Sequence, residues 1–152
     1  MGEVKDLVRR WEKSRKATRT IAAAIPAGKE DFRPAPETVT LGQQVLHVAS
    51  GEKMVRDALT VTRGKWEWNT GIDLEHYSKT TDILAVLDRE TEATRGYLTG
   101  LADTDLATLI KWPWGESTLG DLWYDGIFHE IHHRGCLVTG LRVAGVTAPK
   151  IW

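Results

Sequence analysis

The 152-residue sequence has only one cysteine, Cys136, and no excess of charge of either sign. A single thiol excludes an internal disulfide and a metal cage built from several thiolates, and it suits a reducing cytosol. The 20 basic and 21 acidic side chains leave a net charge of −1. Nucleic-acid-binding domains usually carry a clear basic excess, so we expect no nucleic-acid partner.

Long apolar runs are also missing. The longest clean stretch, Ile21–Ile25, is far too short to cross a bilayer. The first twenty residues are charged throughout and lack the apolar segment of a signal peptide. We therefore expect a cytoplasmic protein with no membrane partner. The length, with 41% apolar and 27% charged residues, predicts one globular domain over residues 1–152.

Four segments carry apolar residues at helical spacing. The expected helices cover residues 4–25, from 38 or 40 to 59, 78–100, and from 117 or 118 to 144. Their expected boundaries are Pro26 at the end of the first, and N-caps at Thr38 or Thr40, Ser78, and Ser117 or Thr118. Few strand signals lie between these segments. The pattern predicts an all-α four-helix bundle with a long crossover connection between the second and third helices.

Four of the seven tryptophans lie in connections and not on helical stripes. The linker 64–77 and the tight loop or small hairpin before the fourth helix hold Trp66, Trp68, Trp112 and Trp114. Two interpretations are open. These rings pack as lids over the bundle ends, or they wall an apolar substrate pocket.

The fourth expected helix contains a candidate metal site. His129 and His133 are four positions apart, so both rings rise from one face, which belongs to the apolar stripe. A polar ring without a partner costs about 1–3 kcal/mol in a core, and a shared metal would satisfy both rings. Alternatively, these residues and His132 form a solvated patch. Glu130 completes a His-Glu-x-x-His pattern, but the absence of a later His, Asp or Glu and of a preceding strand disfavours a metalloprotease.

The second expected helix supplies further polar groups. His47 lies at the flank of its apolar stripe, and Glu52 lies on the stripe, where an unpaired carboxylate would be very costly. Metal sites in bundles are built from side chains on facing helices. Three histidines with one open position are typical of a catalytic zinc or nickel site.

The order of four short segments along the chain resembles the DinB/YfiT-like superfamily, and the resemblance covers essentially the whole chain. The resemblance rests on the segments Phe32–Pro34, Leu46–Glu52, Thr118–Leu122 and His129–Gly135, the last with the pattern His-x-x-His-His-Arg-Gly. It implies a four-helix bundle with a long crossover and a divalent metal held by His47, His129 and His133, with water in an open position. It also implies a homodimer.

Several neighbouring residues have two open interpretations. His132 points away from His133 and is expected to support the site or an interface. Arg134 pairs with a carboxylate across the bundle or is a surface cation. Cys136 is a fourth metal ligand or, as we favour, a small buried hydrophobe. His76 is expected at the surface, unless the crossover carries it or Tyr77 into the pocket.

The resemblance favours a metal-dependent thiol S-transferase or detoxification enzyme that uses a low-molecular-weight thiol of the bacillithiol or mycothiol type. Its partners would be that thiol and a small-molecule electrophile, and Glu52 would hold a metal ligand in position. One alternative is a hydrolase that uses metal-bound hydroxide. Another is a non-catalytic metal-binding protein of a stress response, which a site closed by Cys136 or a site without a cavity would favour.

Overall fold

The computed structural model describes residues 2–113 and 115–151. Within these ranges the helices are α1 (Glu3–Ala22), α2 (Leu41–Thr60), α3 (Thr80–Thr99), the short 3₁₀ helix η1 (Asp103–Ala107) and α4 (Leu119–Val143). The strands β1 (Leu109–Trp112) and β2 (Gly115–Thr118) lie between η1 and α4. This architecture confirms the predicted four-helix bundle. None of the described helices is long and apolar enough to span a membrane.

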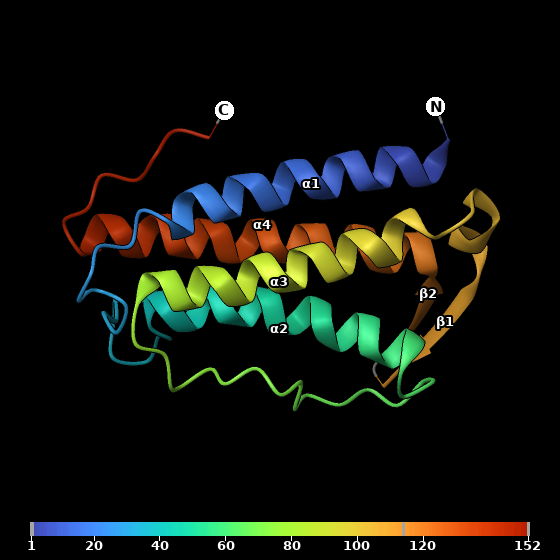
Figure 1. Ribbon diagram of the computed structural model, residues 1–152, viewed down its shortest axis with the longest axis horizontal. Coiled ribbons are helices and arrows are strands. Elements are labelled where there is room, and N and C mark those ends of the chain that lie inside the picture. The colour runs from blue at the N-terminus through green and yellow to red at the C-terminus, as the bar shows by residue number, and fades with distance from the viewer. Residues whose placement is uncertain (1, 114, 152) are drawn as a thin grey trace.

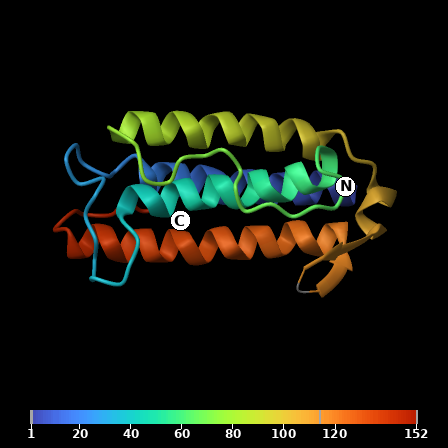
Figure 2. The same cartoon turned by 90° about the horizontal axis from the view of Figure 1, so that it is seen from below.

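The four long helices form a bundle with an unusual chain path. α1 and α4 run in one direction, and α2 and α3 run in the other (Figure 1). α1 and α2 each pack against both α3 and α4. Because α2 and α3 are parallel neighbours, residues 61–79 must return along the length of the bundle before α3 begins (Figures 1 and 2). The predicted crossover is therefore confirmed.

Side-chain caps fix the starts of two helices. The Thr40 hydroxyl accepts a hydrogen bond from the backbone N–H of Gln43, and the Gln43 side chain accepts one from the backbone N–H of Thr40. The Thr118 hydroxyl likewise accepts from the backbone N–H of Asp121. Such caps satisfy backbone donors that the first helical turn leaves free. The prediction of Ser78 as the third cap is wrong, because α3 begins after Lys79.

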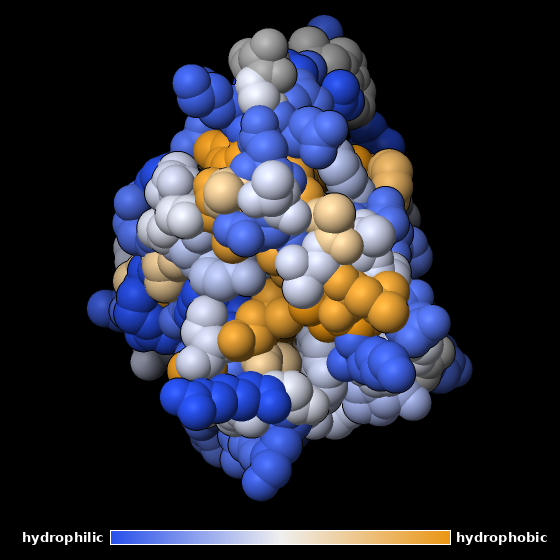
Figure 3. Space-filling model, turned by 90° about the vertical axis from the view of Figure 1, so that its right-hand side faces the viewer, coloured by the Kyte–Doolittle hydropathy of each residue, from blue (hydrophilic) through white to orange (hydrophobic). Residues whose placement is uncertain are grey.

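One end of the bundle is closed by η1 and a β-hairpin. β1 pairs antiparallel with β2, with Leu109 opposite Thr118 and Trp112 opposite Gly115. Leu106 of η1 and Ile110 of β1 join the apolar cluster at this end of the core. Figure 3 looks onto this end, where apolar side chains gather in the middle and hydrophilic ones surround them.

The core consists of two apolar clusters separated by polar side chains. One cluster contains Ile21, Leu46, Leu87 and Leu137, and the other contains Trp11, Leu98, Trp123 and Ile127. Along each helix buried polar residues lie between these two groups, among them Arg15, Glu52, Glu90, Thr94 and Glu130. Buried charges are costly unless they are paired and hydrogen-bonded. This polar layer at mid-height is where the candidate site lies.

Candidate metal centre

The three histidines predicted as metal ligands lie side by side. The Nε2 atoms of His129 and His133 are 2.9 Å apart, and those of His47 and His129 are 3.3 Å apart. One candidate ligand atom from each of the three rings lies within 4.8 Å of the others. α2 supplies His47 and packs against α4, which supplies the other two from adjacent turns. The fold thus brings together residues 82 positions apart in the sequence.

This spacing fits a single divalent ion. In a tetrahedral site with metal–nitrogen bonds of about 2.0–2.1 Å, two ligand nitrogens lie about 3.3–3.4 Å apart. The observed separations of 2.9 and 3.3 Å are close to this value. His129 is exposed, and His47 and His133 are half-buried, so the cluster is open on one side. Imidazole is a ligand that zinc and nickel both accept.

The surroundings favour the neutral imidazoles that bind metals. Burial lowers the pKa of His47. Burial and the nearby His47 and His132 rings lower the pKa of His129. Burial, with the same kind of crowding by other imidazoles, lowers the pKa of His133 from 6.5 to about 4. At neutral pH all three rings therefore have a free lone pair, which is the form that coordinates an ion.

Gln44 contacts the outer nitrogen of one of these rings. Gln44 lies on α2, one helical turn before His47. Its side-chain amide is in hydrogen-bonding contact with Nδ1 of His133. An amide can present either its oxygen or its NH₂ group. When the oxygen accepts the Nδ1 proton, Nε2 of His133 keeps its lone pair for a metal. Sequence analysis missed this residue, although its position three residues before His47 on one helix face was available as a signal.

Glu52 lies in a different place from the one that we expect from the sequence. Its Oε1 accepts a hydrogen bond from Nε1 of Trp11 at 2.7 Å and lies 2.6 Å from Nη2 of Arg15. Five positions after His47, α2 has turned by about 140°, so Glu52 faces α1. The contact with a histidine that we expect of Glu52 is made by Gln44.

Arg15 joins two buried carboxylates in the polar layer. It donates to Glu130 from Nε and Nη2, both at 3.2 Å, and also pairs with Glu52. Burial acts to lower the pKa of Arg15, but the two carboxylates outweigh it and raise the value. Burial raises the pKa of Glu52, the positive charge of Arg15 opposes this shift, and the nearby Glu130 carboxylate adds to it. Glu130 is thus fully engaged by α1, which accounts for its buried position beside His129.

Neither predicted role of Cys136 agrees with the structure. The thiol is exposed, so the prediction of a small buried hydrophobe is wrong. Its Sγ lies 3.9 Å from Nε2 of His132, and it is not among the described residues that could share a metal with the three histidines. Cys136 and His132 lie on a face of α4 that lines an open groove and does not face the core.

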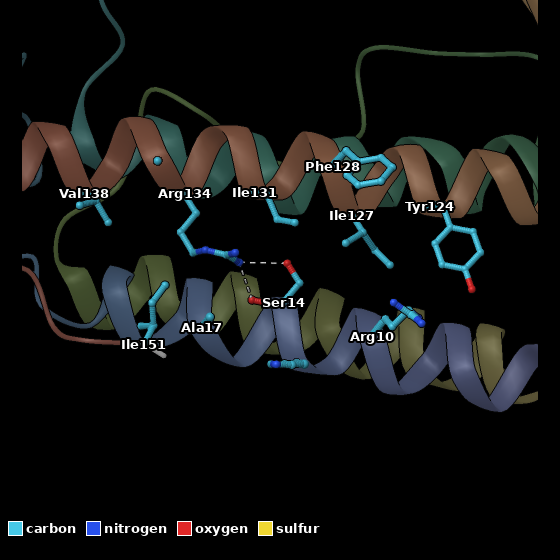
Figure 4. A pocket seen from close by; sticks show the side chains of 12 residues that line it. Arg10, Ser14, Ala17, Tyr124, Ile127, Phe128, Ile131, Arg134, Val138 and Ile151 are labelled. Carbon is cyan, nitrogen blue, oxygen red and sulfur yellow. Dashed lines mark hydrogen bonds between the residues drawn. The ribbon is translucent and has the colours of Figure 1, made fainter. Parts of the chain in front are cut away.

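Arg134 binds α1 through neutral partners. Its Nη1 donates to the backbone oxygen and hydroxyl of Ser14, both at 3.0 Å, and to the hydroxyl of Thr18 at 3.3 Å. Burial lowers its pKa. Figure 4 shows Arg134 in a groove between α1 and α4 whose lining is mostly apolar, with Phe128 and Ile131 among its exposed residues. Neither interpretation from the sequence, a carboxylate pair or a surface cation, describes this position.

A cavity of about 320 Å³ adjoins the three-histidine cluster on one side. His47 of α2 and His129 of α4 form part of its wall. The crossover contributes Trp66 and Trp68, the hairpin Trp112, and α4 Trp123. The structure therefore supports the pocket interpretation for Trp66, Trp68 and Trp112. Trp114 lies outside the described residues.

A second, more open groove of about 700 Å³ adjoins the cluster on the other side. It is lined by His133 and Gln44, and by His132 and Cys136 further along α4. The crossover histidine takes no part in either cavity: His76 is exposed and bonded to Asp73 at 2.9 Å. Tyr77 packs against the start of α2, where its hydroxyl contacts Thr40.

Comparisons with known proteins agree with this architecture. A sequence profile of the DinB superfamily matches residues 10–137. A solved DinB-like protein from Bacillus cereus ATCC 10987 is 18% identical, with 97% of each chain covered and a TM-score of 0.81. A DinB-like protein from Bacillus subtilis, YjoA, is 22% identical over 96% of this chain and 97% of its own, with a TM-score of 0.75.

A third solved relative carries a functional description. YfiT from Bacillus subtilis, described as a probable metal-dependent hydrolase with an unusual four-helix bundle topology, is 16% identical. The match covers 93% of this chain and 87% of YfiT, with a TM-score of 0.73. No curated protein sequence matches the chain. At these identities the structural matches establish the fold.

Proposed function

Because the chain belongs to the DinB superfamily, we propose that it is a metal-dependent enzyme that holds a divalent ion through His47, His129 and His133. Zinc and nickel are the ions that this ligand set suits best. A bound ion would act as a Lewis acid that makes a thiol or a water more acidic. Gln44 would hold His133 in position through its outer nitrogen.

The observation that carries the reaction class is the pair of cavities. His47 and His129 face the tryptophan-walled cavity, and His133 faces the open groove. Two separate spaces that meet at one cluster allow two substrates to approach from different sides. This arrangement supports a transferase that joins a low-molecular-weight thiol, of the bacillithiol or mycothiol type, to an electrophile. A hydrolase needs room for only one organic substrate and a water.

The two cavities suit the two substrates differently. The tryptophan walls favour the less polar electrophile, because aromatic side chains bind apolar groups through large contact areas. The open groove has hydroxyl, amide and imidazole groups that suit a polar thiol. In the reaction, the thiol loses its proton to solvent, and its sulfur forms a bond to the electrophilic carbon. The bond from that carbon to its leaving group breaks, and the leaving group departs with the electron pair.

Hydrolysis is the second candidate, and the description of YfiT favours it. The same histidines would serve, with water in place of the thiol. A non-catalytic metal-binding role in a stress response receives less support. A site closed by Cys136, or a site without a cavity, would favour it. Among the described residues, Cys136 is instead exposed, and two cavities adjoin the three histidines.

The test separates metal binding from chemistry. Metal stoichiometry by calorimetry and elemental analysis should be one ion per chain, and the double variant His129→Ala/His133→Ala should abolish tight binding. Metal-loaded protein should then conjugate bacillithiol or mycothiol to 1-chloro-2,4-dinitrobenzene and fail to hydrolyse nitrophenyl esters and anilides. Ester or amide hydrolysis without conjugation would establish the hydrolase instead. Tight metal binding by the double variant would show that the site is misassigned.

A further inference from the structure

Two glycines in helix interiors line the tryptophan-walled cavity. Gly51 belongs to α2 and lies one helical turn after His47. Gly126 belongs to α4 and lies three residues before His129. Glycine weakens the interior of a helix, because it loses more conformational freedom on folding than alanine does. Neither residue has the positive φ at which glycine is favoured, so backbone geometry accounts for neither of them.

Close packing explains another helical glycine of this chain but not these two. A Cβ atom at Gly42 would lie 2.6 Å from Cε2 of Tyr77, which leaves no room for a side chain. At Gly51 the nearest described atom would be Cε1 of His129 at 3.6 Å, an ordinary van der Waals contact. At Gly126 no described atom beyond the adjoining helix turns would lie within 4 Å. The missing side chains therefore leave space in the cavity, and at Gly51 this space borders His129.

Aromatic rings form another part of the cavity wall. Trp66 and Trp112 meet edge to face at 84°, with ring centroids 6.2 Å apart. Trp66 is anchored by a hydrogen bond from its Nε1 to the backbone oxygen of Lys111. Aromatic rings prefer offset-stacked or edge-to-face contacts with one another. Two indoles nearly at right angles offer both kinds of contact to a third aromatic ring, whereas a puckered aliphatic ring cannot stack.

We propose that the electrophile carries a flat aromatic group, which lies against the bare backbone at Gly51 and Gly126 and contacts the tryptophan rings. The two glycines then determine which electrophiles fit, because a side chain at either position would take up part of the cavity. The inference rests on the proposed function in treating this cavity as the electrophile's side of the three-histidine cluster. It deepens that function, because it gives the shape of the group that the cavity accepts.

Binding to the metal-free protein tests the inference without any assay of activity. Nitrobenzene is the flat probe, and nitrocyclohexane is the matched comparator, with the same nitro group on a puckered ring. Calorimetry should give a dissociation constant at least about threefold lower for nitrobenzene than for nitrocyclohexane. Equal affinity for the two compounds, tighter binding of nitrocyclohexane, or no binding of nitrobenzene would overturn the proposal.

Substitution of the glycines locates the probe. Gly126→Leu should raise the dissociation constant for nitrobenzene at least about tenfold, because leucine fills space that the aromatic ring needs. Gly51→Ala should raise it by a smaller factor, since a methyl group fits against His129 but narrows the cavity. Gly96→Leu, at an exposed position of α3 away from the cavity, should leave it unchanged. Unchanged nitrobenzene binding in both cavity variants would refute the assignment.

The stability of the alanine variants separates this role from a structural one. Alanine is the better helix former, so Gly51→Ala and Gly126→Ala should each raise the urea midpoint while they weaken nitrobenzene binding. The matched control Gly96→Ala should raise the midpoint and leave binding unchanged. A lower midpoint in both cavity variants would show that the glycines serve the packing of the helices, and it would overturn the proposal.

Zinc binding keeps this outcome separate from that of the proposed function. Gly126→Leu should bind zinc with the affinity of the wild-type protein, because residue 126 is not one of the three ligands. Loss of zinc binding in the histidine variants speaks only to the metal centre, and nitrobenzene binding by metal-free protein speaks only to the cavity. A protein that binds zinc but does not prefer nitrobenzene would retain the metal centre and lose this inference.

Discussion

The side-chain amide of Gln44 on α2 contacts Nδ1 of His133 on α4, across 89 positions of sequence. This contact fixes the ring that has the lowest pKa of the three candidate ligands, at about 4. It also determines which nitrogen of His133 can face an ion. Partners of this kind often matter nearly as much as the ligands themselves.

We expect Gln44→Leu to weaken zinc binding by about 10- to 100-fold, because Nδ1 of His133 loses the group that orients the ring. Gln44→Glu keeps an oxygen acceptor at the same place and should restore most of the affinity. Competition titration with a chromophoric chelator measures both. Equal zinc affinity in Gln44→Leu and the wild-type protein would show that the contact does not position the ring.

The metal-free protein should lose stability as the pH falls from about 6.5 towards 4. In this window the unfolded chain binds a proton at residue 133, while the folded protein, whose His133 pKa is lowered to about 4, does not. Protonation therefore favours the unfolded chain. Urea midpoints at pH 7.5, 6, 5 and 4.5 should decline less steeply in His133→Asn. The matched control His76→Asn removes an exposed imidazole, and it should retain the wild-type decline.

Arg15→Met should destabilise the fold by about 3–5 kcal/mol, because two buried carboxylates lose their only shared cation. Adding Glu52→Gln and Glu130→Gln should recover a large part of this loss. Arg19→Met is the matched control. It breaks an exposed pair with Asp88 and should cost no more than about 1 kcal/mol. Chemical denaturation measures the free energy of unfolding of the wild-type protein, Arg15→Met, the triple variant and Arg19→Met. Similar losses in Arg15→Met and Arg19→Met would contradict the buried-pair argument.

Cys136 should react with Ellman's reagent in the native protein at a rate close to that in urea, because its thiol is exposed. Cys136→Ser should bind the same number of zinc ions as the wild-type protein, with an affinity within about threefold, since the thiol lies outside the three-histidine group. Protection of the thiol by zinc, with a loss of affinity in Cys136→Ser, would instead place the sulfur at the metal.

The homodimer stays a prediction, and one surface suits it. The groove between α1 and α4 leaves Phe128 65% and Ile131 43% exposed (Figure 4). Exposed apolar patches of this kind often mark contacts between proteins. We expect light scattering to give twice the mass of one chain, and Phe128→Ser to shift the protein towards the monomer. Val143→Ser removes another exposed apolar side chain of α4, outside this groove, and should leave the mass unchanged.

Much of the fold follows from local sequence signals. Apolar residues at helical spacing predict the four helices, and Pro26 correctly predicts that α1 ends before it. Thr40 and Thr118 are correct caps, because their hydroxyls bond to backbone groups only a few residues away. Ser78 is not a cap, because a serine is able to cap a helix but does not by itself set where the helix begins. The long crossover follows from the length and composition of the linker between two helices.

The candidate site divides differently between sequence and structure. The four-residue spacing within α4 predicts that His129 and His133 share a face, and the structure brings His47 to them. Sequence patterns also place Glu52 on a buried stripe, and it is indeed buried. They do not show that Arg15 and Trp11 reach it from α1, because side chains from distant positions meet only through the packing of the helices.

The sequence by itself determined the all-α class, the helix positions and the shared face of His129 and His133, since spacing along one helix is a local geometric property. Only the tertiary structure decided the rest. It turned Cys136 towards solvent, gave Gln44 its contact with His133, and placed three crossover and hairpin tryptophans around one cavity. The physical reason is that each of these features depends on how α1, α2 and α4 pack and on the path of the crossover. Neither is encoded within a single segment.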